Sequence, residues 1–521
     1  MSEITVGEAL VSLLEAYGVD TIFGIPGVHN VEMYRALPRS KINHILTRHE
    51  QGAGFMADGY ARATGKPGVC FTITGPGLTN ILTPMGQAWS DSSNMLVISS
   101  ALDVADSAQG RGRLHEMRSQ LQAAQSVTAH ASRAYTAFDI QDAVARAFSN
   151  FATTRPRPAY LEIPLDLFTK QAGEGWAAQR LATRVVANND EVKAAAELLS
   201  KAKRPFIILG GGGMMGGASA LRIAEATGAV VLTTTAGKGV VPADHSYVWG
   251  YCLGNPETQH ALQQSDCVLA VGTELSETDF WNGSYRITAP MIRIDIDADV
   301  LARPHRTAVP ILADAATTTA AIAALLTGHK PCHAKPSAPS DDPLRQTLTK
   351  VLNVIRDSLP AETVIASDMT QIAYAANEIF PCSKPRTWLH PVGFGTLGFA
   401  LPAAIGAKFG MGQTPVAALA GDYGFQYTIN ELGTAVEHKL PIPILLWNNS
   451  ALGQIRDDMV NKGIQPNAVT LRKPDFQALA KACGARAEKP ENLKTLGKAI
   501  ATSLKADGPT IIEMSEVMVR G

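Results

Sequence analysis

The chain has 521 residues, of which 46% are hydrophobic and 18% are charged, with a formal net charge of −1. This length exceeds what one hydrophobic core usually serves, so several domains are expected. The balanced charge provides no basic field of the kind that nucleic acids require, and we therefore expect no nucleic-acid partner.

The cysteines and the N-terminal residues indicate the cellular compartment. Six cysteines are scattered without a CxxC pair, which fits a reduced compartment better than a disulfide framework. No apolar run reaches membrane-spanning length, and residues 2–15 are amphipathic and contain acids, unlike a signal peptide. The sequence therefore predicts a cytoplasmic protein with no membrane partner.

Short runs rich in Val and Ile alternate along the chain with longer Ala-rich segments of helical period. This alternation is typical of βαβ units, so we expect an α/β fold with three doubly wound parallel-sheet domains. The expected strands are 21–25, 68–72, 95–99, 205–209, 267–271, 291–296, 363–366, 415–418, 442–447 and 510–514.

Two segments have the composition of linkers. Residues 170–176 contain two glycines, and residues 331–343 contain four prolines among small and charged residues. We place the boundaries there, which gives domains 1–172, 173–335 and 336–521. The first and third domains could share a structure without detectable sequence identity.

The strongest candidate site lies between Gly421 and Asn449. The expected strand 415–418 leads into Gly421-Asp422, and a helical pattern begins near Thr428. A glycine turn between a strand and a helix can present backbone N–H groups to a phosphate.

The residues between Asp422 and Asn449 suffice for one helix and one return strand, which would bring both side chains to neighbouring strand ends of a parallel sheet. A carboxylate, an amide oxygen and a backbone carbonyl are ligands that Mg²⁺ prefers, and Asp422, Asn449 and the carbonyl of Ala451 can supply them. Alternatively, Asp422 caps an ordinary helix and the Asn448-Asn449 pair forms a turn.

The Gly421-Asp422 and Asn448-Asn449 pair resembles the diphosphate signature of the thiamin-diphosphate enzymes of the acetolactate synthase and benzoylformate decarboxylase type. The resemblance covers essentially the whole chain. It implies a pyrimidine-binding, a central Rossmann-like and a diphosphate-binding domain in that order, with thiamin diphosphate and Mg²⁺ as cofactors. Tyr423 stands where the family usually has glycine. Because such positions can need φ > 0, we expect a reshaped loop in which Gly424 approaches the phosphate.

Glu50 follows His49, and this pair invites comparison with zinc proteases. Residue 53 is Ala53, however, so the histidine pair of such a motif is missing. An acidic residue in the first turn of a surface helix remains the plain alternative. By the resemblance, Glu50 hydrogen-bonds N1′ of the aminopyrimidine, which favours the imino form of the 4′-amino group that removes the thiazolium C2 proton. We therefore expect Glu50 in an apolar pocket.

The resemblance implies further cofactor contacts. It assigns the Gly395 carbonyl to the 4′-amino group and Leu397 to the wedge beneath the two rings. Thr370 and Gln371 fall where the family contacts diphosphate oxygens, although an ordinary loop remains possible there. The other implied cofactor contacts are Pro26, Asn80, Gly424 and Gly453. Because Glu50 of one subunit reaches cofactor held by another in this family, a homodimer is the expected minimum and a homotetramer the expected assembly.

The expected substrate is a small-molecule 2-oxo acid, and acids gather where its side chain would bind. Asp279, Asp457 and Asp458, with Glu277 as a fourth candidate, could line a cation site, because a planar guanidinium pairs best with carboxylates. Solvated surface charges are the alternative. Val28 stands where benzoylformate decarboxylases carry a serine. Its apolar side chain cannot donate the hydrogen bond that a serine hydroxyl can.

Longer runs resemble the 5-guanidino-2-oxopentanoate (2-ketoarginine) decarboxylases of this family, at residues 236–239, 278–281, 388–391 and 446–458. This implies non-oxidative decarboxylation to 4-guanidinobutanal and CO₂, with His115 as candidate proton carrier and His390 as the other. Leu114-His115-Glu116 replaces the Phe-Gln-Glu of acetolactate synthases, and Asp458 and Ala129 replace their tryptophan and lysine.

Three alternatives stay open. An acetolactate synthase-like carboligase or a benzoylformate-type decarboxylase is nearest in kind. The glycine run 210–213 after an expected strand leaves a flavin- or NAD-dependent oxidoreductase as a remote alternative, because we expect the run to lack both the spaced glycine fingerprint and its acidic ribose partner. A non-catalytic homologue used for assembly is the third, and retention of Glu50 argues against it.

Overall fold

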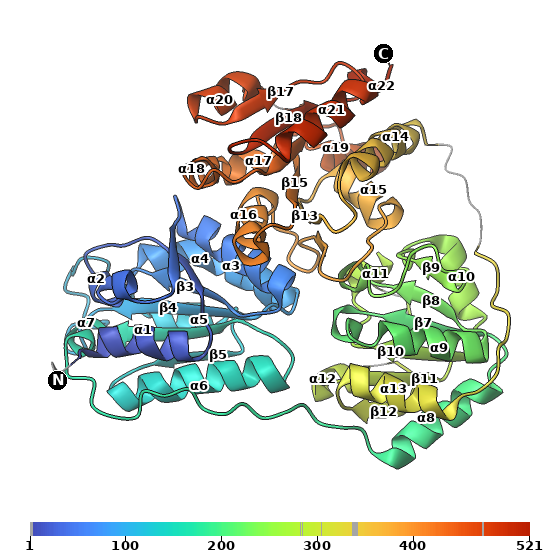
Figure 1. The fold of residues 1–521 in the computed structure, drawn as a ribbon, viewed down its shortest axis with the longest axis horizontal. Coiled ribbons are helices and arrows are strands. Elements are labelled where there is room, and N and C mark those ends of the chain that lie inside the picture. The colour runs from blue at the N-terminus through green and yellow to red at the C-terminus, as the bar shows by residue number, and fades with distance from the viewer. Residues whose placement is uncertain are drawn as a thin grey trace. The chain divides into compact units, whose positions relative to one another are not determined.

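The computed structural model describes residues 4–281, 283, 285–303, 305–335, 342–470, 472 and 474–520 (Figure 1). Three six-stranded sheets are present, and their registered strand pairs are parallel, which confirms the α/β prediction. Contacts divide the chain into two compact units. The first unit comprises residues 1–182, 364–371 and 393–521, and the second comprises residues 183–363 and 372–392.

The N-terminal sheet of the first unit has the strand order β2-β1-β3-β4-β6-β5. Its strands are β1 (Thr21–Gly24), β2 (Asn43–Leu46), β3 (Gly68–Thr72), β4 (Met95–Ala101), β5 (His130–Arg133) and β6 (Ala159–Pro164). Its helices are α1 (Val6–Ala16), α2 (Val31–Tyr34), α3 (Glu50–Thr64), α4 (Pro76–Ser90), α5 (Gln120–Gln125), α6 (Ala137–Thr153) and α7 (Leu165–Phe168). The central strands β3 and β4 are buried throughout, as expected of parallel strands covered on both faces.

The C-terminal sheet has the order β14-β13-β15-β16-β18-β17. Its strands are β13 (Val364–Ser367), β14 (Trp388–Leu389), β15 (Val416–Gly421), β16 (Pro443–Trp447), β17 (Arg486–Glu488) and β18 (Thr510–Met514). The helices of this region are α14 (Pro343–Ser358), α15 (Gln371–Ile379), α16 (Ala400–Met411), α17 (Gly424–Tyr427), α18 (Leu432–Glu437), α19 (Gly453–Asn461), α20 (Phe476–Ala482), α21 (Leu493–Ser503) and α22 (Val517–Arg520). Counted along the chain, this strand order is identical to that of the N-terminal sheet, so the suggested likeness of the first and third domains is confirmed at the level of topology.

The sheet of the second unit has the order β12-β11-β10-β7-β8-β9, the arrangement of a dinucleotide-binding fold. Its strands are β7 (Pro205–Leu209), β8 (Val230–Thr233), β9 (Val248–Gly250), β10 (Cys267–Val271), β11 (Met291–Asp295) and β12 (Thr307–Leu312). Its helices are α8 (Asn189–Lys201), α9 (Gly217–Thr227), α10 (Pro256–Gln263), α11 (Glu277–Phe280), α12 (Ala298–Leu301) and α13 (Ala315–Leu325). The predicted boundaries at 172/173 and 335/336 stay predictions.

Within the first unit, α3 packs against α16 at backbone distance. A Cβ added to Gly59 would lie 2.1 Å from the Ala403 carbonyl oxygen, and one added to Gly406 would lie 1.8 Å from that of Met56. Any side chain at either glycine would therefore clash with backbone. The glycines let the helix that begins at Glu50 meet the C-terminal half of this unit closely.

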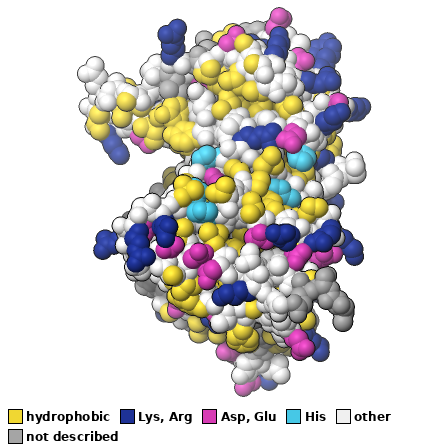
Figure 2. Space-filling model, turned by 90° about the vertical axis from the view of Figure 1, so that its left-hand side faces the viewer, with side chains coloured by type: hydrophobic (Ala, Val, Ile, Leu, Met, Phe, Trp, Pro, Cys, Tyr) yellow, Lys and Arg dark blue, Asp and Glu magenta, His cyan; other side chains and the backbone are white. Residues whose placement is uncertain are grey.

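The surface carries mixed charges. On the face in Figure 2, Lys and Arg side chains lie interspersed with Asp and Glu, and hydrophobic side chains are spread between them. This agrees with the net charge of −1 and shows no continuous basic area on that face. Among the described residues, no helix is both long and apolar enough to cross a bilayer.

Candidate functional site

Three loops meet at the carboxyl ends of the neighbouring strands β13, β15 and β16. A Cβ added to Gly421 would lie 2.8 Å from Thr370 Oγ1, and one added to Gly453 would lie 2.5 Å from Gln371 Oε1. The two glycines therefore allow the loop after β13 to touch the loops after β15 and β16. This is the edge at which ligands bind in open α/β sheets.

Oxygen atoms gather at this edge around Asp422, which is only 2% exposed. Its Oδ2 accepts from the Ser450 backbone N–H at 2.8 Å, and Oδ1 accepts from that of Tyr423 at 3.0 Å. Asn449 donates to Gln371 Oε1 at 3.1 Å and accepts from the Ala451 N–H at 3.1 Å. Asp422, Asn449 and Ala451 therefore lie together, as the sequence reasoning expected, although their metal contacts stay a prediction.

The donor set fits magnesium better than a softer metal. Across the described ranges, no group of three or more His, Cys, Asp or Glu side chains could hold a metal ion. A site built from one carboxylate, one amide, one carbonyl and ligand phosphate oxygens suits a hard cation such as Mg²⁺. Ser450, between the two candidate ligands Asn449 and Ala451, has φ of +55°, a conformation that non-glycine residues adopt mainly where the surroundings impose it.

Tyr423 does not adopt a positive φ, and the expected reshaping of its loop stays a prediction. This residue has φ of −79° and ψ of −53°, so it lies in the right-handed helical region, where a side chain causes no strain. The helix begins at Gly424, earlier than the predicted start near Thr428. A Cβ on Gly424 would lie 2.7 Å from Asp368 Oδ2, so this glycine admits a buried carboxylate, and its phosphate contact stays a prediction.

Asp368, which the sequence reasoning missed, anchors the loop that contains Gly395 and Leu397. Both of its carboxyl oxygens accept from the Gly398 N–H, at 3.1 and 2.9 Å. Burial raises the pKa of Asp368 to about 6. Gly395 has φ of +65°, a backbone conformation that favours glycine. Leu397 is half-buried, so its apolar side chain remains partly accessible.

Glu50 is the first residue of α3 and is 9% exposed. Asn80 Nδ2 donates to its Oε2 at 2.9 Å, and a Cβ added to Gly77 would lie 3.5 Å from its Oε1. The carboxylate is thus enclosed, but it has a polar partner where we expected only apolar walls. Asn80 orients Glu50 in this structure, and its own cofactor contact stays a prediction.

One face of α4 connects Glu50 with the Gly395 loop. Besides Asn80, this face carries Gln87, whose Oε1 accepts from the Thr396 hydroxyl at 2.7 Å and from its N–H at 3.2 Å. Asp91 Oδ1 accepts from the Gly393 N–H at 2.8 Å. Positions 80, 87 and 91 recur at helical spacing, a signal in the sequence that would have identified this face.

Two histidines pair near the loops after β1 and β4. The rings of His29 and His115 meet edge to face with centroids 4.8 Å apart, and both Nδ1 atoms are buried without a hydrogen bond among the described residues. Burial, followed by the charge of His115, lowers the pKa of His29. The sequence reasoning identified His115 but not His29. Val28, beside it, is 69% exposed, and Pro26 is exposed as well.

The candidate substrate acids differ in their partners. Asp457 Oδ2 accepts from Gln371 Nε2 at 2.8 Å, and its Oδ1 pairs with the Arg456 guanidinium at 2.9 Å. Asp458 accepts from the uncharged Gln454 amide at 3.1 Å. Asp457 therefore already has a guanidinium partner on its own helix, which makes Asp458 the stronger candidate for binding a cationic substrate.

Two other candidates lie in the second unit. Asp279 is 7% exposed, and its Oδ2 accepts from the backbone N–H and the hydroxyl of Ser276 in a capping box, a role that requires no substrate. His390 is buried, and its ring lies near those of Tyr374 and Trp388. Substrate roles for both residues stay predictions.

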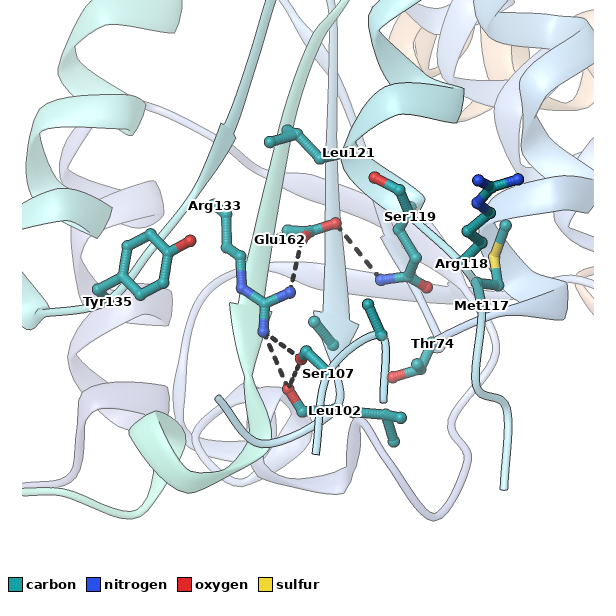
Figure 3. Close-up of a pocket in the computed structure, with 13 residues that line it drawn as sticks. Thr74, Leu102, Ser107, Met117, Arg118, Ser119, Leu121, Arg133, Tyr135 and Glu162 are labelled. Atoms are coloured by element: carbon teal, nitrogen blue, oxygen red, sulfur yellow. Dashed lines mark hydrogen bonds and ion pairs between the residues drawn. The ribbon is translucent and has the colours of Figure 1, made fainter. Parts of the chain in front are cut away.

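A cavity of about 210 Å³ lies beside Thr74, in the loop between β3 and α4 (Figure 3). Arg133 reaches across it to Glu162 Oε1 at 3.2 Å and also donates to Ser107 and to the Leu102 carbonyl. Gln120 accepts from the Gly75 N–H at the start of α4. None of the predicted cofactor or metal residues is among the residues that line this cavity.

The glycine run of the second unit is explained by packing. Gly210 donates to the Val271 carbonyl at 2.9 Å, and Gly212 donates to the Gly272 carbonyl at 3.0 Å. A Cβ on Gly210 would lie 2.2 Å from that last oxygen. Backbone therefore fills the edge between β7 and β10, where a pyrophosphate would bind in a dinucleotide fold. Gly211, Gly213 and Gly216 do have the G-x-G-x-x-G spacing, but β8 ends in threonines where the acidic ribose partner would stand.

Comparison with known proteins places this geometry in a family. Models of the thiamine pyrophosphate enzymes match residues 4–124 (N-terminal binding domain), 192–322 (central domain) and 368–514 (C-terminal binding domain). A probable 2-ketoarginine decarboxylase of Pseudomonas aeruginosa is 43% identical over 99% of this chain and 95% of its own length. The chain belongs to the thiamine pyrophosphate enzyme family.

Other relatives belong to the synthase branch. A probable acetolactate synthase large subunit of Methanocaldococcus jannaschii is 33% identical over 94% of this chain and 88% of its own length. The isozyme 2 large subunit of Escherichia coli acetolactate synthase is 30% identical over 97% and 94%. Family membership makes this chain an enzyme that uses thiamin diphosphate, which the family binds through Mg²⁺.

Proposed function

We propose that this chain is a Mg²⁺- and thiamin-diphosphate-dependent decarboxylase that converts 5-guanidino-2-oxopentanoate into 4-guanidinobutanal and CO₂. The observation that carries the proposal is the meeting of Asp422, Asn449 and Gln371 at one sheet edge, from which α19 continues with Asp457 and Asp458. The relative named as a probable 2-ketoarginine decarboxylase supports this choice of substrate.

The C-terminal edge would hold the cofactor by its diphosphate. Asp422, Asn449 and the Ala451 carbonyl would bind the Mg²⁺, and Thr370, Gln371 and Gly453 would contact the phosphate oxygens. The close approach of the loops at Gly421 and Gly453 fits this role, because a side chain at either position would collide with Thr370 or Gln371. Gly424 adds a backbone N–H at the start of α17, although a helix this short contributes little dipole.

Bound thiamin diphosphate supplies the electron sink that allows a 2-oxo acid to lose its carboxylate as CO₂. Glu50 would share a proton with N1′ of the aminopyrimidine, with Asn80 holding the carboxylate in place. The Gly395 carbonyl would accept from the 4′-amino group, and Leu397 would keep the two rings bent. Asp368 and Gln87 hold that loop by hydrogen bonds on either side of Leu397.

His115 would deliver the proton that replaces the lost carboxylate. The net reaction consumes one proton and releases one CO₂ per aldehyde formed, so one proton donor is needed at the substrate end. The His115 ring has a buried Nδ1 without a partner among the described residues, and the His115 carbonyl oxygen would lie 2.6 Å from a Cβ added to Gly75, directly before α4. His29 stands beside it as a second titratable ring.

An acetolactate synthase-like carboligase is the second candidate, which the relatives of 30–33% identity favour. The two candidates share the cofactor chemistry and differ in whether a proton or a second 2-oxo acid is added after CO₂ leaves. Formation of acetolactate from pyruvate would identify the carboligase. For either activity we propose a homodimer as the minimum unit, a homotetramer as the assembly and the cytoplasm as the location, which sedimentation and cell fractionation would test.

The test is CO₂ release from a panel of 2-oxo acids, in the presence of thiamin diphosphate and Mg²⁺, by the wild type, Asp458→Asn and Asp457→Asn. We expect the guanidino acid to be the best substrate. Asp458→Asn should raise its KM about three- to tenfold, the value of one partly exposed charge-assisted hydrogen bond, and leave an uncharged 2-oxo acid unaffected. Asp457→Asn is the control, because Arg456 already neutralises Asp457. Equal losses for both substrates in Asp458→Asn would refute the cation site.

A further inference from the structure

The N-terminus of α3, where Glu50 lies, is held by a carboxylate from the C-terminal half of the same unit. Glu431 is 0% exposed. Its Oε1 and Oε2 accept from the Arg48 backbone N–H at 3.1 and 3.2 Å. Arg48 stands two residues before Glu50, so Glu431 fixes the backbone that leads into Glu50.

Every described partner of Glu431 is a hydrogen-bond donor. Besides the Arg48 backbone N–H, Thr434 Oγ1 donates to Oε2 at 2.8 Å and Asn430 Nδ2 donates to Oε1 at 3.1 Å. An ionised carboxylate can accept all of these bonds, whereas the amide of a glutamine would turn an N–H₂ group toward one of the donors. The site is therefore specific for a carboxylate.

The chain makes room for this contact at Gly52. A Cβ added there would lie 2.2 Å from Glu431 Oε1 and 2.4 Å from its carboxyl carbon. A side chain at position 52, two residues after Glu50, would therefore push the buried carboxylate away. His49 completes the helix start, because its Nδ1 accepts from the Gln51 N–H at 3.1 Å.

We propose that Glu431 is a positioning residue for Glu50: it clamps the backbone before Glu50 so that the Glu50 carboxylate meets N1′ of the cofactor in the reactive geometry. The inference rests on the proposed function only through the role of Glu50 in cofactor activation, and it is independent of the substrate. Glu431 lies in the diphosphate-binding half of the chain, but the backbone that it holds belongs to the pyrimidine-binding half.

The experiment follows the activation step without any substrate. It measures how fast the C2 proton of enzyme-bound thiamin diphosphate exchanges with deuterium, by acid quenching and proton NMR, at saturating thiamin diphosphate and Mg²⁺. We expect Glu431→Gln to slow the exchange about tenfold, because a small misplacement of a catalytic group costs one to two orders of magnitude. Glu431→Asp keeps the charge but shortens the reach, so its loss should be smaller. Gly52→Ala should slow the exchange as Glu431→Gln does.

Glu437→Gln is the matched control. Glu437 also lies on the C-terminal half and pairs with Arg48, through the guanidinium at 2.6 Å, but its side chain is 47% exposed. This variant changes the same charge beside the same residue without touching the backbone before Glu50, so its exchange rate and cofactor affinity should equal those of the wild type.

A double-variant cycle separates positioning from general support of the fold. If Glu431 acts through Glu50, adding Glu431→Gln to Glu50→Gln should slow the exchange no further. A wild-type exchange rate in Glu431→Gln overturns the proposal, and so does an equal additional loss in the Glu50→Gln background. If Glu431→Gln fails to fold, Glu431→Asp is compared with Glu437→Gln in the same cycle. Because no 2-oxo acid is present, a wrong substrate assignment would leave every one of these outcomes unchanged.

Discussion

The N-terminal and C-terminal sheets of the first unit have the same strand order but different chemistry at their carboxyl edges. After the third strand of the N-terminal sheet comes α4, which carries Asn80, whereas Asp422 directly follows the third strand of the C-terminal sheet. After the fourth strand stand His115 and Asn449. The shared topology thus places loops at the same edge of each sheet, whereas the residues in those loops would decide which ligand group each edge suits.

The two edges also depend on each other for support. Gln87 and Asp91 of the N-terminal half hold the loop that contains Gly395, and Glu431 of the C-terminal half holds the backbone before Glu50. Each half therefore positions a predicted catalytic element of the other.

In the sheet of the second unit, backbone fills the carboxyl edge between β7 and β10. Its strand order is that of a dinucleotide fold, and Gly211, Gly213 and Gly216 have the matching spacing. However, the glycine run packs directly on Gly272, with Gly212 donating to its carbonyl. Strand order and glycine spacing alone therefore do not establish a nucleotide site.

The largest expected effect follows from removing the chemistry of the N-terminal edge. Glu50→Gln keeps the size of the side chain and an acceptor for Asn80, but it cannot exchange a proton with N1′. We expect kcat to fall about 10²- to 10⁴-fold, the usual contribution of general acid–base catalysis, with little change in cofactor affinity. Steady-state kinetics and calorimetric titration with thiamin diphosphate measure the two quantities. Unchanged turnover would remove Glu50 from the mechanism.

The converse variant is Asp422→Asn at the C-terminal edge. Its amide would face the N–H group of Ser450 or Tyr423 and would lack the charge for Mg²⁺, so thiamin diphosphate should bind about 100-fold more weakly. At saturating cofactor much of kcat should return, which is the opposite of the Glu50→Gln result. Chelation of Mg²⁺ should release the cofactor from the wild type. If Asp422→Asn binds as tightly as the wild type, the two edges are not divided as proposed.

Several buried strands were predictable because their hydrophobic runs are continuous, although β6 and β8, which are also buried along their full length, were missed. β3, β7, β10 and β18 have the predicted bounds, since each is buried along its full length. The edge strand β5, with the sequence His-Ala-Ser-Arg, has no such run, because half-exposed strands need no apolar sequence. Edge strands were accordingly missed.

The candidate site was predictable where an uncommon residue pattern marks it. It was not predictable where a residue is recognised only by its contacts in the folded chain. Asp422 and Asn449 were found because a Gly-Asp turn and an Asn pair at this separation are uncommon. Asp368 and Glu431 were missed because buried acids that accept backbone N–H groups leave no pattern in the sequence around them. The start of α17 at Gly424 was missed for a related reason, because the hydrophobic pattern does not mark where this helix begins.

The smallest expected effect concerns two buried acids, one on each half of the unit. Burial raises the pKa of Asp58 on α3 and of Asp368 after β13 to about 6, from 3.8. The surroundings of the two carboxyl groups differ. Asp368 accepts from Met369 and Gly398 backbone N–H groups, whereas Asp58 lies 3.9 Å from the Arg62 guanidinium, and neither of its oxygens has a well-formed hydrogen bond among the described residues.

The pH dependence of stability follows from these pKa values. A carboxyl group whose pKa is higher in the folded state binds a proton that the unfolded chain releases, so stability is full below pH 3.8 and is lost as the pH rises through about 6. Asp58→Asn removes that loss and should stabilise the protein by about 2 kcal/mol at pH 7, somewhat less than the pKa shift implies because the amide is also buried.

Asp368→Asn removes the same titration but turns N–H₂ toward backbone donors, so it should destabilise the protein. Denaturant unfolding of both variants between pH 4 and 7.5 measures this difference. Equal shifts in the two variants would mean that burial alone, and not the backbone donors of the C-terminal edge, sets the stability of these carboxyl groups.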